Sequence, residues 1–577
     1  MKAHILPQQC VNRRLSLTST TATLPRIATT LLKFIGVTWL LVLHNSRYAD
    51  DLLAWHLALP ITDIDDSNMT VLTSRAAPLL TQSLRQPLPR LLLCVGVALP
   101  LLTACAATPL QAAHAQPSVP KQSQAPIKTT ALTFTETLDN GLKIIVRPDH
   151  RAPVVMTQIW YKVGSVDEPI AQTGLSHALE HMMFKGTAKV PNGELSRIVS
   201  QFGGSQNAFT SNHFTGYYQL YPANRLALAL ELEADRMKNL ILTAEDFTPE
   251  MRVIMEERRQ RTDDNPQSLA YEKFRMLAFP TSSNRYPIIG HMDSLELMPL
   301  DALKAWYQTW YHPNNAVVVI VGDVQPTQAI AEVKRYFAQI PAGAVPTRID
   351  TRERQLFGRR HLDLRLAIQV PSLMMAFNVP TLSAQAPSSS EPITATAPAD
   401  AYTLALLAAV LDGGLSARLE QRLVREQRIL TAVSSGYNPF ERGSSLFSVS
   451  AIPAADQTHA TAQAAILNEI ERLKTDPITD AELARVKAGY IADLIYNQDD
   501  LSSQARWIGS LEVAGLDHHL IDQLPERLSQ ISVAQLQDAA KRYLIADNLS
   551  TLYVSPDTAT TTTAAPTTTA SSAGVQP

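Results

Sequence analysis

The chain is poor in cysteine, and the few cysteines it has lie near its beginning. Among 577 residues there are only three: Cys10, Cys94 and Cys105. The remaining four-fifths of the chain can therefore hold no disulfide framework and no zinc site built from cysteine thiolates.

A strong charge of either sign is also missing. The sequence has 50 lysine and arginine residues against 53 aspartate and glutamate residues, which gives a net charge of −3 at pH 7. It contains no long basic tract, so binding to nucleic acid has no electrostatic support. The length exceeds what one hydrophobic core usually holds, and we expect two or more domains with appended segments.

The N-terminal region contains two apolar runs. The first, residues 29–44, is short for a membrane-spanning helix, which needs about 20 residues. The second, residues 91–102, follows the basic stretch 85–90 and ends in Leu102-Thr103-Ala104-Cys105. This layout is typical of a secretory signal, and we predict a signal peptide over residues 69–104, starting at Met69.

The end of this signal resembles the lipobox of bacterial lipoproteins, in which Cys105 is lipidated and becomes the mature N-terminus. Ala106 follows the cysteine in place of aspartate, which by the same resemblance favours sorting to the outer membrane. We therefore expect a lipid anchor in the membrane and a place at the periplasmic face of the outer membrane, or in the periplasm, of a Gram-negative bacterium. An ordinary signal peptide with a coincidental cysteine is the alternative.

Three further segments are predicted to lie outside the folded domains. Residues 1–68 are either a misassigned upstream extension or an unusual N-terminal anchor. Residues 105–130, rich in alanine, proline, glutamine and serine, are typical of a flexible tether. Residues 558–577 are mainly threonine, alanine and proline, and this composition predicts a disordered tail.

Mixed strand and helix patterns fill the region between these segments. Asn140-Gly141 separates two alternating runs, which predicts a β-hairpin. A helix followed by Tyr311, Asn315 and an apolar strand recurs weakly near Tyr543 and Asn548. We predict an α+β fold of two homologous α/β sandwich domains, each a mainly antiparallel sheet packed with helices, over residues 131–345 and 346–557.

The stretch that carries chemistry is His177-x-x-Glu180-His181. Residues four apart lie on one face of a helix, so the two histidines present their imidazoles to a common point, with Glu180 beside them. Such a pair can clamp zinc, while the neighbouring carboxylate acts as general base toward water on the metal. The pattern is the signature of inverted zinc peptidases. Because it is short, a histidine-bearing amphipathic helix is the alternative.

Catalytic zinc needs a third protein ligand. A helix expected over residues 247–262, with Pro249 near its start, offers three carboxylates: Glu250, Glu256 and Glu257. Glu250 and Glu257 are two turns apart and share a face with Val253 and Ile254, whereas Glu256 turns toward arginines. A face with two aliphatic side chains should look inward. We therefore predict Glu257 as the ligand and Glu250 as a partner behind it.

Together these residues resemble the pitrilysin/insulinase family of zinc peptidases, which includes the mitochondrial processing peptidase. The resemblance spans about residues 132–557 and extends to three more motifs: Gly203-Gly204-x-x-Asn207-Ala208-x-Thr210, Tyr286-Pro287-Ile288-Ile289-Gly290 and Tyr311-His312-Pro313-Asn314-Asn315. It implies one zinc ion per chain, bound by His177, His181 and Glu257, with Glu180 activating water to hydrolyse a peptide bond.

The resemblance also assigns roles around the metal. The strand with Asn207 and Ala208 would pair with an extended peptide substrate by β-augmentation, and Glu250 would orient a histidine ligand. Glu250 as a plain acid near a helix N-terminus and Asn207 as a turn residue are the alternatives. Three other histidines are interpreted as structural or surface residues: His213, His291 and His312.

The second half lacks one residue that the family uses. Family members enclose the substrate between two halves of two domains each, and the half opposite the zinc supplies an arginine and, seven residues later, a tyrosine. This chain, with its two domains, resembles the zinc-bearing half alone. Arg425 matches the arginine, but Ala432 stands where the tyrosine is expected. We predict a zinc-less homologous partner subunit that carries both residues; a homodimer working without the tyrosine is the alternative.

The sequence thus predicts a zinc metalloendopeptidase that acts on unfolded peptides or proteins. A non-catalytic structural or assembly subunit of a heteromeric complex is the alternative. A zinc-storage lipoprotein is disfavoured because the chain has no histidine-rich tract.

Overall fold

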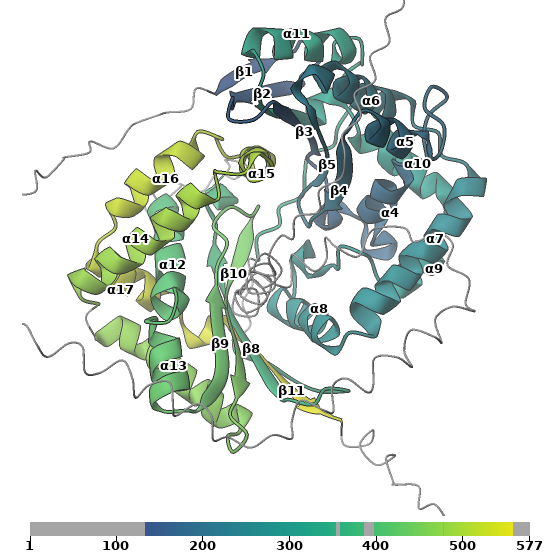
Figure 1. Cartoon of the computed structure of the whole chain (residues 1–577). Helices are drawn as coiled ribbons and strands as arrows, with labels where there is room; N and C mark the ends of the chain where they lie inside the picture. Colours follow the sequence, from purple (N-terminus) through teal and green to yellow (C-terminus); the bar gives the residue numbers. More distant parts are fainter. Residues whose placement is uncertain (1–132, 354–357, 386–396, 477, 558–577) are drawn as a thin grey trace, which may run out of the picture. The chain divides into compact units, whose positions relative to one another are not determined.

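The computed structural model describes residues 133–353, 358–385, 397–476 and 478–557 (Figure 1). The predicted upstream extension, signal peptide, lipidation site Cys105, tether and C-terminal tail all lie outside these residues. The predicted domain boundary between residues 345 and 346 stays a prediction. Within the described ranges no helix is both long and apolar enough to cross a membrane.

The first half contains a six-stranded sheet in the order β1-β2-β6-β3-β5-β4. Its strands are β1 (Phe134–Thr137), β2 (Lys143–Pro148), β3 (Val154–Tyr161), β4 (Ser205–Thr210), β5 (Thr215–Pro222) and β6 (Ala316–Gly322). Neighbouring strands are antiparallel except β2 and β6, which are parallel. The predicted hairpin is confirmed: Thr137 pairs with Lys143, and Gly141 adopts φ 85° in the turn. Strand β4 lies at the edge, so one side of its backbone is free to pair with another chain.

The helices of the first half, apart from α8, pack over one face of this sheet. The helices of this half are α4 (Leu175–Met182), α5 (Glu194–Gln201), α6 (Leu226–Asn239), α7 (Ala244–Arg258), α8 (Pro266–Ala278), α9 (Met292–Glu296), α10 (Leu300–Trp310) and α11 (Pro326–Phe337). Side chains of β2 alternate between the two faces, as a strand requires. Ile144 and Val146 join the core under the helices, whereas Ile145 belongs to a separate apolar cluster on the other face.

The second half contains a five-stranded sheet in the order β7-β11-β8-β10-β9. Its strands are β7 (Arg360–Leu366), β8 (Ser372–Pro380), β9 (Leu430–Gly436), β10 (Ser444–Pro453) and β11 (Leu549–Pro556), with only β7 and β11 parallel. Its helices are α12 (Ala397–Asp412), α13 (His459–Thr475), α14 (Asp480–Tyr496), α15 (Leu501–Val513), α16 (Leu520–Ser529) and α17 (Val533–Tyr543). Two mixed, largely antiparallel sheets packed with helices confirm the predicted α+β fold.

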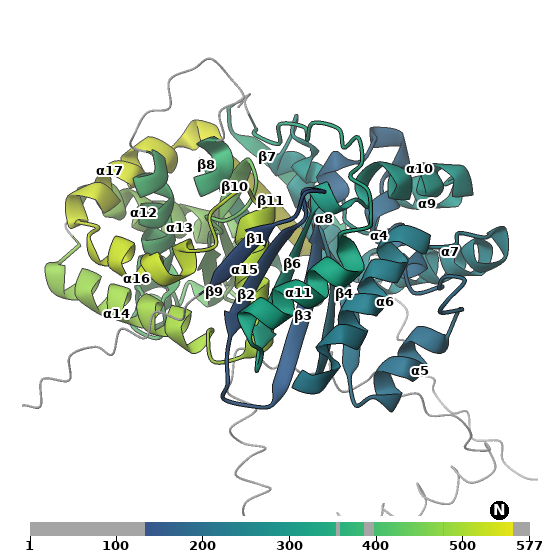
Figure 2. The ribbon, with the colours of Figure 1, turned by 90° about the horizontal axis from the view of Figure 1, so that it is seen from above.

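Each half lends one helix to the other half's sheet. Helix α15 packs Ala505, Ile508 and Val513 against β3 and β6 of the first sheet, on the face opposite α11 (Figure 2). Gly509 allows this approach, because a Cβ there would lie 2.1 Å from Cε2 of Trp160. In return, α8 of the first half packs Ala270 and Phe274 against β8 and β11 of the second sheet. Each sheet is thus covered on one face by a helix from the other half of the chain.

Helix α7 begins earlier than the sequence predicted. Thr243 is its N-cap and accepts a hydrogen bond from the Asp246 backbone N–H, so Pro249 lies inside the helix. The predicted start near residue 247 is wrong because a capping threonine with acidic residues after it outweighs the preference of proline for the first turn.

The predicted orientation of Val253 is also wrong, since 53% of that residue is exposed. The buried stripe of α7 consists of Phe247, Met251, Ile254 and Arg258. Val253 lies about 130° from the centre of this stripe, whereas Glu250 and Glu257 lie on its flank. In the second half, Glu420–Glu426 form a π-helical turn.

Candidate metal centre

Helix α4 carries the His-x-x-Glu-His motif and is fixed at its start by a residue outside it. Its N-cap, Gly174, has φ 94° and no side chain to satisfy the first N–H groups. The buried carboxylate of Glu168 takes this place and accepts hydrogen bonds from the backbone N–H groups of Gly174 (2.6 Å) and Ser176 (2.7 Å). The buried residues of the helix include Leu175, Ala178, Leu179 and Met182, which anchor it in the core.

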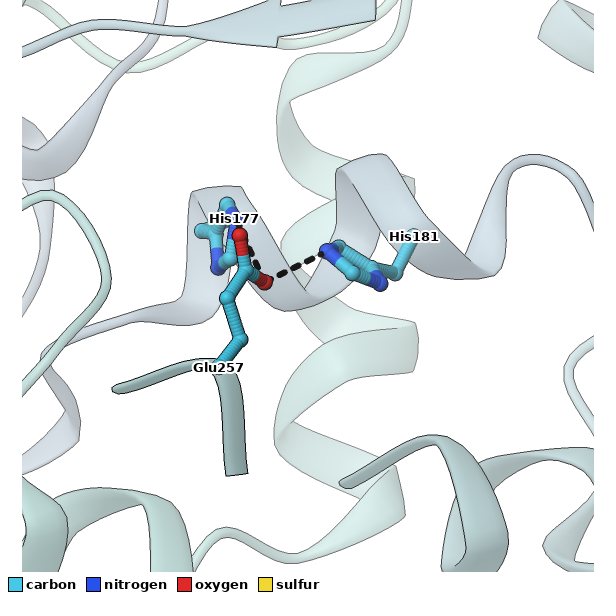
Figure 3. Close-up of side chains that lie close together, drawn as sticks. All are labelled: His177, His181 and Glu257. Atoms are coloured by element: carbon cyan, nitrogen blue, oxygen red, sulfur yellow. Dashed lines mark ion pairs between the residues drawn. The ribbon is translucent and has the colours of Figure 1, made fainter. Parts of the chain in front are cut away.

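His177, His181 and Glu257 converge as predicted. The two imidazole centroids are 4.7 Å apart. Oε2 of Glu257, at the end of α7, lies 3.7 Å from Nε2 of His177 and 3.3 Å from Nε2 of His181 (Figure 3). The three ligand atoms all lie within 4.8 Å of one another, and this buried carboxylate oxygen has no hydrogen-bond partner of good geometry. Two imidazole nitrogens and one carboxylate oxygen around a common point fit a catalytic zinc ion.

Glu250 lies behind the group and holds one of its histidines. Nδ1 of His181 donates to Oε1 of Glu250 at 2.7 Å, while Lys185 forms an ion pair with the other oxygen of Glu250. The hydrogen bond from His181, joined by Lys185, lowers the pKa of Glu250 to about 2. Glu250 thus stays ionised and turns Nε2 of His181 toward Glu257, which is the geometry of the predicted partner.

The two histidines have different electrostatic surroundings. Burial lowers the pKa of His177 to about 4, which favours the neutral, metal-binding form of its ring. Burial acts in the same direction on His181, but its hydrogen bonds and attraction to Glu250 and Glu257 outweigh it and raise the pKa to about 9. Glu250 and Glu257, which both face His181, therefore favour positive charge at this imidazole.

Glu180 lies next to the ligands and is held by the edge strand. Its Oε2 accepts a hydrogen bond from the hydroxyl of Thr210 on β4, and burial raises the pKa of Glu180. Thr210 belongs to a motif quoted from the sequence, but its contact with Glu180 was not foreseen. The sequence does not show which way the Thr210 hydroxyl points, because its direction depends on where β4 lies relative to α4.

Asn207 and Ala208 lie inside β4, so the alternative of Asn207 as a turn residue is wrong. The backbone N–H of Ala208 donates to Oδ1 of Asn207 at 2.9 Å. It is therefore not used in the ladder with β5 and faces the free edge of the sheet. The asparagine side chain satisfies this N–H group in the absence of a pairing strand.

A cavity of about 840 Å³ adjoins the metal-binding group. Its wall includes His177, Glu180, Glu257 and Ala208. Several wall residues were not singled out as site residues by the sequence: Arg261, Tyr271, Arg275, Arg285 and Glu441. Nη1 of Arg261 forms an ion pair with Oε1 of Glu257 at 2.6 Å, and its spacing four residues after a ligand is the only sign of it in the sequence.

The remaining predicted residues are not part of the cavity wall. Arg425 is half exposed and pairs with Glu420 at 3.2 Å. Ala432 is exposed on β9, an edge strand of the second sheet. None of the three histidines set aside in the sequence belongs to a metal-binding group in the described part of the chain.

Known proteins similar to this chain include zinc proteases. The chain is 29% identical over 447 residues to the zinc protease PqqE of Helicobacter pylori, which covers 77% of this chain and 95% of that protein. The crystal structure of a protease from Helicobacter pylori aligns with a TM-score of 0.67 and 28% identity over 74% of this chain and all of that one. The periplasmic protease PqqL from Escherichia coli shares the fold, with a TM-score of 0.62 at 19% identity, over 73% of this chain and 47% of that one.

Two family models match consecutive parts of the sequence. The model described as insulinase (peptidase family M16) matches residues 143–290, and the model described as the peptidase M16 inactive domain matches residues 298–490. Together they cover more than half of the chain. The name of the similar protein PqqE, a zinc protease, agrees with the group of two histidines and one glutamate that α4 and α7 bring together. The chain belongs to the insulinase (M16) family of peptidases, the pitrilysin/insulinase family that its motifs resemble.

Proposed function

We propose that this protein is a zinc-dependent endopeptidase that hydrolyses unfolded peptides, with Glu180 as its general base. The observation that carries the proposal is the convergence of His177, His181 and Glu257 beside Glu180 in one cavity. Zinc, when bound by these three residues, would polarise the scissile carbonyl and lower the pKa of water at the site.

The proton chemistry falls to Glu180. It takes a proton from the attacking water and later delivers it to the nitrogen of the leaving amine, so that the bond between carbonyl carbon and nitrogen is broken. Thr210 holds one carboxylate oxygen of Glu180, and the Glu180 side chain lines the cavity. Burial raises the pKa of Glu180, which makes it a stronger base for this transfer.

The free edge of β4 offers a way to bind the peptide. An extended substrate would pair with the backbone of this strand, and the N–H of Ala208 would leave Oδ1 of Asn207 for a substrate carbonyl. Pairing through backbone groups requires an unfolded segment and depends little on its sequence. The cavity wall then decides which side chains are accepted.

Substitution of Glu180 tests this proposal. We expect Glu180→Gln to keep one zinc ion per chain and to lose cleavage of an unstructured peptide, because the amide cannot take the proton. The matched control is Glu256→Gln, on the same helix as Glu257 but exposed, which should cleave normally. If the zinc-loaded protein, tested with any partner that co-purifies, cleaves no unstructured peptide, the protein is not a peptidase and a non-catalytic assembly role takes its place.

A zinc-less homologous partner subunit is part of the proposal. Ala432 cannot supply the tyrosine that the family places opposite the zinc, and the chain aligns with less than half the length of PqqL. We expect the full-length protein to co-purify from its native host with a homologue that carries the arginine and the tyrosine. A purified homodimer with full activity would contradict this part of the proposal.

The location of the protein in the cell is proposed from residues 85–105 alone. If Cys105 is the lipidated residue of a lipoprotein in a Gram-negative periplasm, labelled palmitate should be incorporated into the wild-type protein and not into Cys105→Ser. Incorporation into both, or into neither, would contradict the lipid anchor.

A further inference from the structure

We propose that the cavity beside the metal centre selects substrates with an acidic side chain near the scissile bond, and that Arg285 is the residue that binds it. This inference rests on the proposed function, because it concerns the substrate of the same cavity. The supporting observations are the ion pairs and hydrogen bonds of the charged side chains in the cavity wall.

Arg285 reaches the cavity wall from a short 3-10 helix, Ser283–Arg285. Its Nη1 donates to the carbonyl of Pro280, and its Nη2 lies 3.5 Å from the hydroxyl of Tyr286. The guanidinium carbon is 5.3 Å from the centroid of the Tyr286 ring. These contacts hold the group in place, but all of them are with neutral partners. A guanidinium has five N–H donors, so several remain for a ligand.

The carboxylates of the same wall are already engaged. Arg258, which is not part of the wall, donates hydrogen bonds of 3.0 and 3.3 Å to the two carboxylate oxygens of Glu272. Glu257 is paired with Arg261 and faces the two histidines. Glu441 is half-buried and accepts a hydrogen bond from Asn438 at 3.4 Å, and desolvation raises its pKa. Among the described residues, no carboxylate of the wall forms an ion pair with Arg285.

A second arginine strengthens the positive charge at this place. Arg275 donates to the carbonyl of Asn284 and stands 5.2 Å from the centroid of the Phe279 ring. It forms no ion pair within 4 Å with a described carboxylate, although Glu441 is close enough to feel its charge. Two arginines with mainly neutral partners thus border the space that a bound peptide would fill.

An acidic side chain of the substrate would supply the missing counter-ion. A carboxylate can accept two parallel hydrogen bonds from one guanidinium, and such charged pairs are about twice as strong as neutral ones. A glutamine of the same shape offers one acceptor and no charge. Because the cavity is open to solvent, we expect a preference of about tenfold in kcat/KM for glutamate over glutamine.

The test uses two series of unstructured peptides that differ only by glutamate or glutamine at one position, placed in turn at each of three positions on either side of the cleaved bond. The zinc-loaded wild-type protein should prefer glutamate by about tenfold at one position or more. Arg285→Gln should remove this preference while still cleaving the glutamine peptides. The matched control is Arg335→Gln on α11, because Arg335 also lies over the ring of the tyrosine that follows it but is remote from the cavity.

Wild-type protein alone gives a second measurement that does not depend on the folding of a variant. The preference should shrink several-fold between about 50 and 500 mM salt, because an ion pair open to solvent is screened. No preference at any position, or a preference that survives in Arg285→Gln, overturns the inference while leaving the peptidase in place. A protein that cleaves neither series overturns the proposed function, and this inference with it.

Discussion

Gly509 on α15 permits a close contact between the two halves, and replacing it with alanine should destabilise the protein. The new Cβ would lie 2.1, 2.2 and 2.6 Å from three atoms of the Trp160 ring. Since ordinary contacts begin near 3.4 Å, the helix must retreat from the sheet by more than an ångström. Such overpacking typically costs about 1–3 kcal/mol, and loss of the hydrogen bond from Trp160 to Gln158 adds about 1 kcal/mol.

A second helical glycine provides the matched comparison. Gly489 on α14 has no atom within 4 Å of an added Cβ. Gly489→Ala should therefore show only the gain in helix propensity, about 1 kcal/mol of added stability. The same gain offsets part of the cost at residue 509, which leaves a net loss of about 1–3 kcal/mol for Gly509→Ala.

Thermal or urea unfolding of the two variants, followed by circular dichroism, measures this difference. The midpoint should rise for Gly489→Ala and fall for Gly509→Ala, although both changes are identical in chemistry. If both variants are stabilised to the same extent, α15 does not pack against Trp160 as described, and the reasoning is refuted.

Three further predictions concern the metal centre. Thr210→Val should lower kcat about 10- to 100-fold with zinc content unchanged, because a hydrogen bond to the charged Glu180 is worth about 1.5–3 kcal/mol, whereas Thr210→Ser should stay near wild type. Burial raises the pKa of Glu168 from 4.5 to about 8, so the folded state binds a proton more tightly than the unfolded state. The contribution of this group to the free energy of unfolding is then complete below about pH 4.5 and is lost as the pH rises toward 8, by up to about 1.4 kcal/mol per pH unit. The free energy of unfolding of Glu168→Gln should lack this pH dependence. Equal slopes of the free energy of unfolding against pH for the two proteins would refute the prediction. A zinc chelator should abolish peptidase activity, and added zinc should restore it; activity that survives complete removal of zinc, checked by metal analysis, would contradict the proposed function.

The parts of the site that follow from helix periodicity could be predicted from the sequence. Residues four apart on α4 and seven apart on α7 had to lie on common faces, and this places His177, His181, Glu250 and Glu257 correctly. The family resemblance supplied the pairing between the two helices, which periodicity alone does not give. The overall α+β fold followed from the same patterns and from turn signals such as Asn140-Gly141.

Features that depend on contacts distant in sequence were missed. Burial of apolar surface is not directional, so the apolar faces of α8 and α15 did not reveal that each covers the sheet of the other half. The bond from Thr210 to Glu180 and the neutral surroundings of Arg285 depend on where loops and strands meet, which no local pattern encodes. Pro249 predicts too late a start for α7, because proline is favoured in the first turn of a helix whereas Thr243 caps this helix six residues earlier.

The exchange of α8 and α15 has a consequence for the growing chain on the ribosome. The last strand of the first sheet ends at Gly322, and the helix that covers its outer face begins at Leu501, about 180 residues later. At roughly 5–20 residues per second, that apolar face stays open for roughly 10–40 seconds of synthesis. Ile145, Trp160 and Val319 would be exposed in this interval. Exposed apolar surface of this kind favours aggregation, so a chain cut between the halves should aggregate unless the missing helix is supplied in trans.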